Sequence, residues 1–182
     1  MSYRGVLTAF CASAVLLSAS EAGAQTSVSL PDTSQSTTFS ATVSEQARVI
    51  VPATVVFTVN DVASATNASA AAVTIDQIVL ASATKQLRVS LQANAASFTA
   101  PGGSGTTWSA SDVTWNAASW SNGTGASGSL SAAAFNSVAT CNADTTDCST
   151  TGLVFTLGAK PTVNRAGTHT LTVTWKFESI GS

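Results

Sequence analysis

Charged side chains are scarce in this sequence. Seven lysines and arginines face nine aspartates and glutamates among 182 residues, and the formal net charge is −2. Proteins that bind nucleic acid need a basic surface to neutralise phosphates. This chain has a net negative charge, so we expect no nucleic-acid partner. Disordered chains usually combine low hydrophobicity with high net charge. This chain is 45% hydrophobic with little charge, and we therefore expect it to fold.

Histidine is nearly absent, which disfavours most hydrolytic mechanisms. His169 is the single histidine, whereas a hydrolase needs an activated nucleophile, a base and an orienting acid brought together. No Gly-x-Ser-x-Gly turn follows a strand and opens a helix. The alternating pattern instead places His169 near the start of the last strand, as a residue with a satisfied hydrogen bond. We predict no catalytic residues, no cofactor and no enzymatic activity.

Long apolar runs are missing except at the N-terminus. A basic Tyr3-Arg4 start precedes the mostly apolar residues 5–17, and Ala22-Gly23-Ala24 forms a small-x-small site. This layout is typical of a secretory signal peptide, cleaved after Ala24. No later run approaches the ~20 residues that span a bilayer. We therefore expect a signal peptide over residues 1–24 and a secreted, extracellular or cell-surface protein with no transmembrane segment in the mature chain.

Cysteine is also rare, and one of the three, Cys11, lies in the predicted signal. Cys141 and Cys148 remain, and an even count in an exported protein predicts a disulfide between them. The short loop that it closes contributes roughly 2–3 kcal/mol in the chain-entropy model. A redox or metal pair is the alternative, although no histidine is nearby in the sequence. Asp144 and Asp147 supply oxygens of the kind that calcium prefers, but acidic residues are common in turns, and we predict no metal site.

Period-two alternation dominates the rest of the chain. Leu171, Val173, Trp175 and Phe177 alternate with polar residues, as in a strand with one face in the core. Residues 129–138 contain three consecutive alanines, with Leu130, Phe135 and Val138 roughly at helical spacing, and predict a short helix or a turn. Further strands are expected over residues 37–43, 48–51, 54–59, 73–80, 87–91, 113–115 and 153–157. We predict an all-β fold, an antiparallel immunoglobulin-like β-sandwich of about 7–9 strands with at most one short helix; a barrel is the second choice.

Residues 25–36 precede the first strong alternation and contain only two large apolar side chains, Val28 and Leu30. They predict either a flexible leader or a strand-donating arm that pairs with the last strand of another subunit. The β-sandwich domain is then expected over residues 37–182.

A long polar stretch, residues 102–128, contains three tryptophans. A loop of that length tends to be functional or disordered. Exposed indoles stack on sugar rings, so Trp108, Trp115 and Trp120 predict a ligand-binding platform in a carbohydrate-binding module. The alternative is that the three rings pack as a core over the end of the sandwich, because large exposed apolar patches are costly.

Two bacterial families share features with this chain. Residues 87–99, Val154-Phe155-Thr156-Leu157 and 167–177 resemble the layout of WxL-type surface domains, which are β-sandwiches attached non-covalently to the cell wall. The signal, the Ser/Thr/Ala-rich composition, the cysteine pair and the last strand also resemble pilins of the chaperone–usher and spore-coat-U type. In those pilins, a neighbour's N-terminal strand completes an incomplete sandwich. Both resemblances imply a structural or adhesive surface protein whose partners are copies of itself, other surface subunits, glycan or cell wall.

Overall fold

The computed structural model describes residues 26–181, so the predicted signal peptide lies outside the described residues. The chain divides into two compact units, and the boundary falls between Ala41 and Thr42. The second unit, which ends at Ser182, contains all the described strands. The sequence prediction places the start of the β-sandwich domain at residue 37.

The described residues contain twelve strands, two three-residue 3-10 helices and no α-helix. The elements are β1 (Gln46–Ile50), β2 (Thr66–Asn67), β3 (Ala71–Val79), β4 (Gln86–Ala93), η1 (Pro101–Gly103), η2 (Ala110–Asp112), β5 (Val113–Trp115), β6 (Ser119–Trp120), β7 (Gly123–Gly125), β8 (Gly128–Ser129), β9 (Asn136–Cys141), β10 (Cys148–Leu153), β11 (Phe155–Leu157) and β12 (Val173–Ile180). There are more strands than predicted because residues 119–129 contain the short strands β6, β7 and β8, and because β2 and β9 were not expected. A helix over residues 129–138 does not form, since β9 already begins at Asn136.

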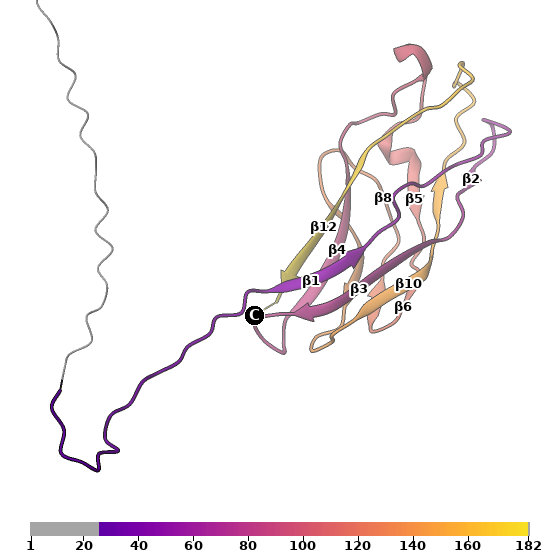
Figure 1. Cartoon of the computed structure of the whole chain (residues 1–182). Coiled ribbons are helices and arrows are strands. Elements are labelled where there is room, and N and C mark those ends of the chain that lie inside the picture. The colour runs from indigo at the N-terminus through magenta and orange to yellow at the C-terminus, as the bar shows by residue number, and fades with distance from the viewer. Residues whose placement is uncertain (1–25, 182) are drawn as a thin grey trace, which may run out of the picture. The chain divides into compact units, whose positions relative to one another are not determined.

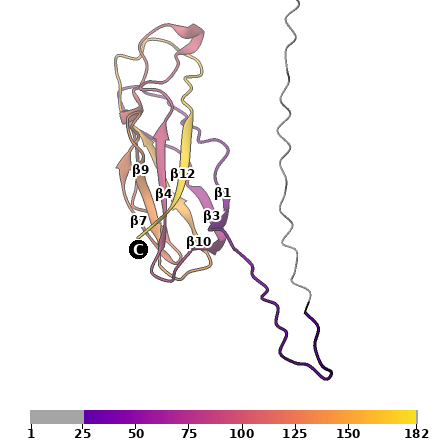
Figure 2. The same cartoon turned by 90° about the vertical axis from the view of Figure 1, so that its left-hand side faces the viewer.

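The strands form three antiparallel sheets, which confirms the all-β prediction. Their strand orders are β1-β3-β10, β2-β11-β5-β8 and β12-β4-β9-β7-β6. Figures 1 and 2 show the layer of β12, β4 and β9 beside the layer of β1, β3 and β10. The two layers enclose a core in which alternate residues of β3 and β4 are completely buried, among them Val73, Ile75, Val89 and Leu91. A sandwich of this kind follows from strands that each carry one apolar face.

Side chains on the inner face of the last strand, β12, are incompletely buried. Trp175 pairs with Leu91 and Phe177 pairs with Val89, so each pair points to the same side of the sheet. Leu91 and Val89 are fully buried, but Trp175 and Phe177 are only half-buried. Since β12 is the edge strand of its sheet, these large rings lie where the sandwich lacks a neighbouring strand.

Two predicted strands do not form. Residues 37–43 belong to no strand, and Phe39 is 93% exposed. Residues 54–59 follow β1 along the chain but have no regular secondary structure. The alternation in both segments suits a pleated strand, yet a strand forms only where a second edge is available to pair with it.

The start of β1 is anchored by the carboxylate of Glu45. Its Oε1 accepts hydrogen bonds from the Ala81 amide (2.8 Å), the Lys85 ammonium (3.1 Å) and the Ser179 hydroxyl (3.1 Å). These donors come from the β3–β4 turn, from the residue before β4 and from the end of β12. The Ala81 amide, and next the Lys85 ammonium, hold the pKa of Glu45 below its usual 4.5. The chain is therefore fixed in place from Glu45 onward.

We expect acid to weaken this anchor. Because the pKa of Glu45 is lower in the folded protein than in the unfolded chain, its stabilising effect is complete above the ordinary carboxyl value and disappears as the pH falls through the folded value. Glu45→Gln should therefore lower the free energy of unfolding slightly at neutral pH, and the difference from the wild type should shrink as the pH falls below the ordinary carboxyl value. Urea titrations of both proteins at neutral pH and over a series of acidic pH values test this, and a difference that grows in acid contradicts it.

Candidate functional site

An open apolar groove of about 700 Å³ lies in the β-domain. One wall is residues 52–57, which follow β1, and the other is residues 167–173, which lead into β12. Trp175 also lines it. The remaining lining residues are Val59 and residues that belong to or pack against the core: Leu91, Phe98, Trp108, Val113, Leu130, Phe155 and Leu157. The groove is therefore an opening into the core, and we define it by these walls and this floor.

Both walls present unpaired backbone. Residues 53–59 make no backbone–backbone hydrogen bond with any other described residue. On the other wall, Thr170 exchanges two backbone hydrogen bonds with Thr99 (2.7 and 3.1 Å), and β12 pairs only with β4. The opposite edge of this wall and of β12 has no neighbouring strand in the described part of the chain. Open strand edges of this kind are templates for an additional strand.

The side chains along the walls are apolar and incompletely covered. Leu171, Val173 and Trp175 alternate along one wall and are half-buried. On the other wall, Val55 is 36% and Val56 is 69% exposed. Exposed apolar side chains concentrated at one place usually mark an interaction site. The groove thus offers main-chain donors and acceptors at its sides and an apolar floor between them.

His169 lies in the groove wall and both of its ring nitrogens have partners. Nε2 faces the Arg165 carbonyl oxygen at 3.0 Å and so donates to it, which leaves Nδ1 to accept from the Thr107 hydroxyl at 2.7 Å. The ring also contacts Trp108 edge-on, with centroids 5.2 Å apart. These contacts confirm the prediction that His169 has a satisfied hydrogen bond. They link the groove wall to the loop that contains Thr107.

The three tryptophans of the polar stretch are buried, at 5% exposure for Trp108, 3% for Trp115 and 8% for Trp120. Trp108 Nε1 donates to the Gly158 carbonyl (2.9 Å), and Trp115 Nε1 donates to the Ala126 carbonyl (3.0 Å). Their ring faces are covered, so the prediction of an exposed sugar-stacking platform is wrong and the alternative of a packed core is confirmed. Strands β5 and β6 contain Trp115 and Trp120, whereas Trp108 precedes η2. For Trp115, the alternation Val113-Thr114-Trp115 is the sequence signal of an inward-facing ring.

Tryptophan fluorescence should show this difference in exposure. We expect acrylamide to quench only a minor part of the emission, because three indoles are buried and Trp175 is half-buried in the groove. Trp175→Phe should remove most of the quenchable component. Strong quenching that persists in Trp175→Phe contradicts the burial of the other three rings.

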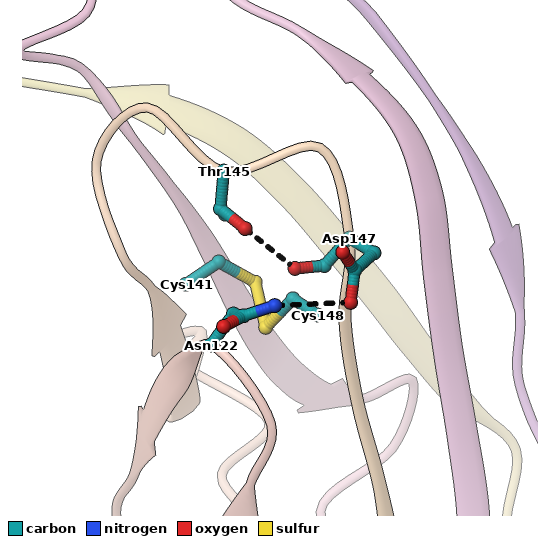
Figure 3. Close-up of a disulfide and its surroundings, with 5 residues drawn as sticks. All are labelled: Asn122, Cys141, Thr145, Asp147 and Cys148. Atoms are coloured by element: carbon teal, nitrogen blue, oxygen red, sulfur yellow. Dashed lines mark hydrogen bonds between the residues drawn. A yellow bond between two sulfur atoms is a disulfide. The ribbon is translucent and has the colours of Figure 1, made fainter.

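The predicted disulfide between Cys141 and Cys148 is present and completely buried (Figure 3). It joins β9 to β10 and so links two different sheets. Asp147 takes part in the same loop, where its carboxylate accepts from Asn122 Nδ2 (3.1 Å) and its carbonyl accepts from the Thr145 hydroxyl (2.9 Å). Within residues 26–181, no three metal-ligating side chains come together.

No protein-family model, curated protein or solved structure matches this chain. The resemblances to WxL-type domains and to pilins therefore stay predictions. Among the described residues, no helix is long and apolar enough to cross a membrane.

Proposed function

We propose that this chain is a non-enzymatic structural subunit, exported to a bacterial surface, that works by holding an extended polypeptide strand in its groove. The observation that carries the proposal is an apolar groove whose two walls, residues 52–57 and 167–173, both leave backbone groups unpaired. A strand inserted there gains main-chain hydrogen bonds on its sides, and its alternate side chains enter the core, as in strand addition.

The half-buried rings of β12 support this role. Trp175 and Phe177 lie on the core side of the sheet but are not covered as their partners Leu91 and Val89 are. Burial of apolar surface contributes about 25 cal/mol per Å², so an inserted strand that covers this face gains affinity from it. A glycan partner has no comparable support, because the three indoles proposed for it are covered.

Sedimentation velocity over a range of protein concentrations tests the proposal. The chain without residues 1–24 should self-associate, and Val55→Lys/Val56→Lys should remain monomeric because two charges then line the groove wall. Both valines are already exposed, so the fold should tolerate the change. Val79→Lys is the control, since Val79 is 38% exposed, close to the 36% of Val55, but lies outside this groove. A wild-type protein that is monomeric throughout, or a double variant that still associates, contradicts the proposal.

A further inference from the structure

We propose that His169 makes occupation of the groove depend on pH: an apolar strand binds while the imidazole is neutral and is released when the ring becomes charged. The proposal rests on the function proposed above and adds its regulation. Three features of the molecule lead to it, namely the composition of the groove lining, the hydrogen bonds of the imidazole and the charges around it.

The groove lining contains a single titratable side chain. Apart from His169, the described residues that line it are apolar residues, glycine, proline and threonines, with no lysine, arginine, aspartate or glutamate. Imidazole is the side chain whose charge ordinarily changes between about pH 5 and pH 8, and His169 is the only histidine of the chain. A change of pH in this range therefore alters the charge of the groove at one place.

The hydrogen bonds of the imidazole match its neutral form. Nε2 faces the Arg165 carbonyl oxygen at 3.0 Å, which can only accept, so this nitrogen holds the proton. Nδ1 lies 2.7 Å from the Thr107 hydroxyl and accepts from it. Protonation turns Nδ1 from an acceptor into a donor. The charged form therefore reverses the bond that links this groove wall to the loop that contains Thr107.

No carboxylate offsets a positive charge at this place. Within residues 26–181, none of the ion pairs includes His169. The loop that it contacts, residues 104–109, has no charged side chain, and neither has the opposite wall, residues 52–57. Arg165, whose carbonyl accepts from the imidazole, is itself a cation. The surroundings of the ring therefore supply no anion that would stabilise its charged form.

The charged groups of the adjoining elements are paired with one another. The 3-10 helix η2 follows Trp108 and ends at Asp112, whose carboxylate is paired with Lys160 at 2.8 Å. In β12, Lys176 and Glu178 form an ion pair, and they occupy positions that alternate with the core-facing side chains of the strand. These carboxylates already have cationic partners, so they do not replace the missing counter-charge.

A strand that covers the groove makes a charged ring more costly. Water reaches the half-buried imidazole while the groove is open. An apolar strand displaces this water, and an ionised group that loses water without gaining a partner carries a free-energy cost. Strand binding therefore favours the neutral ring, and protonation weakens strand binding to the same extent. Because one proton is involved, the affinity falls by at most about tenfold for each pH unit.

Sedimentation velocity between about pH 8 and about pH 5.5 tests this coupling on the chain without residues 1–24. The association constant of the wild type should fall with the pH, by up to about tenfold per unit. His169→Gln should associate with nearly the same constant throughout, because glutamine offers an amide donor and a carbonyl acceptor but takes up no proton. This range lies above the usual carboxyl pKa values, so the ion pairs keep their charges.

The outcomes separate the regulation from the function of the groove. If the wild type associates equally well at every pH, or if His169→Gln keeps the pH dependence of the wild type, the inference is overturned and the groove function stands. If the wild type associates at no pH in the range, the proposed function itself fails.

Proton NMR of the wild type gives a second answer that needs no substitution. The Cε1 proton of His169 belongs to the only histidine of the chain, so its resonance identifies itself. The imidazole should take up its proton at a lower pH in the associated protein than in the dilute monomer, because the coupling between proton and strand is reciprocal. Equal titration midpoints in the two states overturn the inference.

Discussion

Replacing Trp115 with alanine is expected to lower the free energy of unfolding by about 3–5 kcal/mol, the range typical of large aromatic residues removed from a core. The indole is 3% exposed, and its Nε1 donates to the Ala126 carbonyl at 3.0 Å. Its ring packs edge-on against Phe155 with centroids 6.4 Å apart. A domain of this size is stable by only about 5–15 kcal/mol, so the variant should lose much of its total stability.

Urea denaturation measures this loss, and two further variants sharpen the result. Trp115→Phe should cost less, because a smaller cavity remains although the indole hydrogen bond is lost. Gly128→Ala should also destabilise the fold, since a Cβ there would lie 2.6 Å from Cζ2 of Trp115 and overpacking typically costs about 1–3 kcal/mol. A loss of less than about 1 kcal/mol for Trp115→Ala is incompatible with its place in the core.

Removal of the disulfide is expected to have the second large effect. Cys141→Ala/Cys148→Ala should lower the free energy of unfolding by about 2–5 kcal/mol, the usual cost of losing a native bridge in a small exported domain. Both sulfurs are fully buried, and the bridge ties β9 to β10 across two sheets. The unfolded chain gains freedom, while the folded protein loses packing between its layers.

The free energy of unfolding of the double variant is compared with that of the wild type, measured with and without reductant. Guanidinium titrations should place the oxidised wild type above both the reduced wild type and the double variant, and those two should be close to each other. If the double variant is as stable as the oxidised wild type, the bridge does not stabilise the fold and the account of the sheet contact is wrong.

The sequence alone predicts those features whose determinants lie close together along the chain. The final strand was predicted from Leu171 to Phe177, and β12 occupies Val173–Ile180 and pairs with β4 along its whole length. The cysteine pair was equally clear, because only two cysteines follow the predicted signal. For the strand and for the disulfide, the residues that allow the prediction are the residues that form the feature.

The groove could not be predicted in the same way. Its floor combines Phe98, Trp108, Leu130 and Phe155, which are distant in sequence and meet only through the sheet order. Residues 37–43 have the alternation of a strand, but pairing depends on which edges are free after the other strands have formed. The local pattern therefore predicts a strand over residues 37–43 that the structure does not contain.

Hydrogen exchange of the backbone amides of residues 53–59 tests most directly whether the groove is completed by another copy. These amides have no backbone partner among the described residues of a single chain. The account predicts rapid exchange in dilute wild-type protein and in Val55→Lys/Val56→Lys at any concentration, and strong protection in concentrated wild-type protein. Equal exchange at all concentrations, or equal protection in the variant, would contradict it.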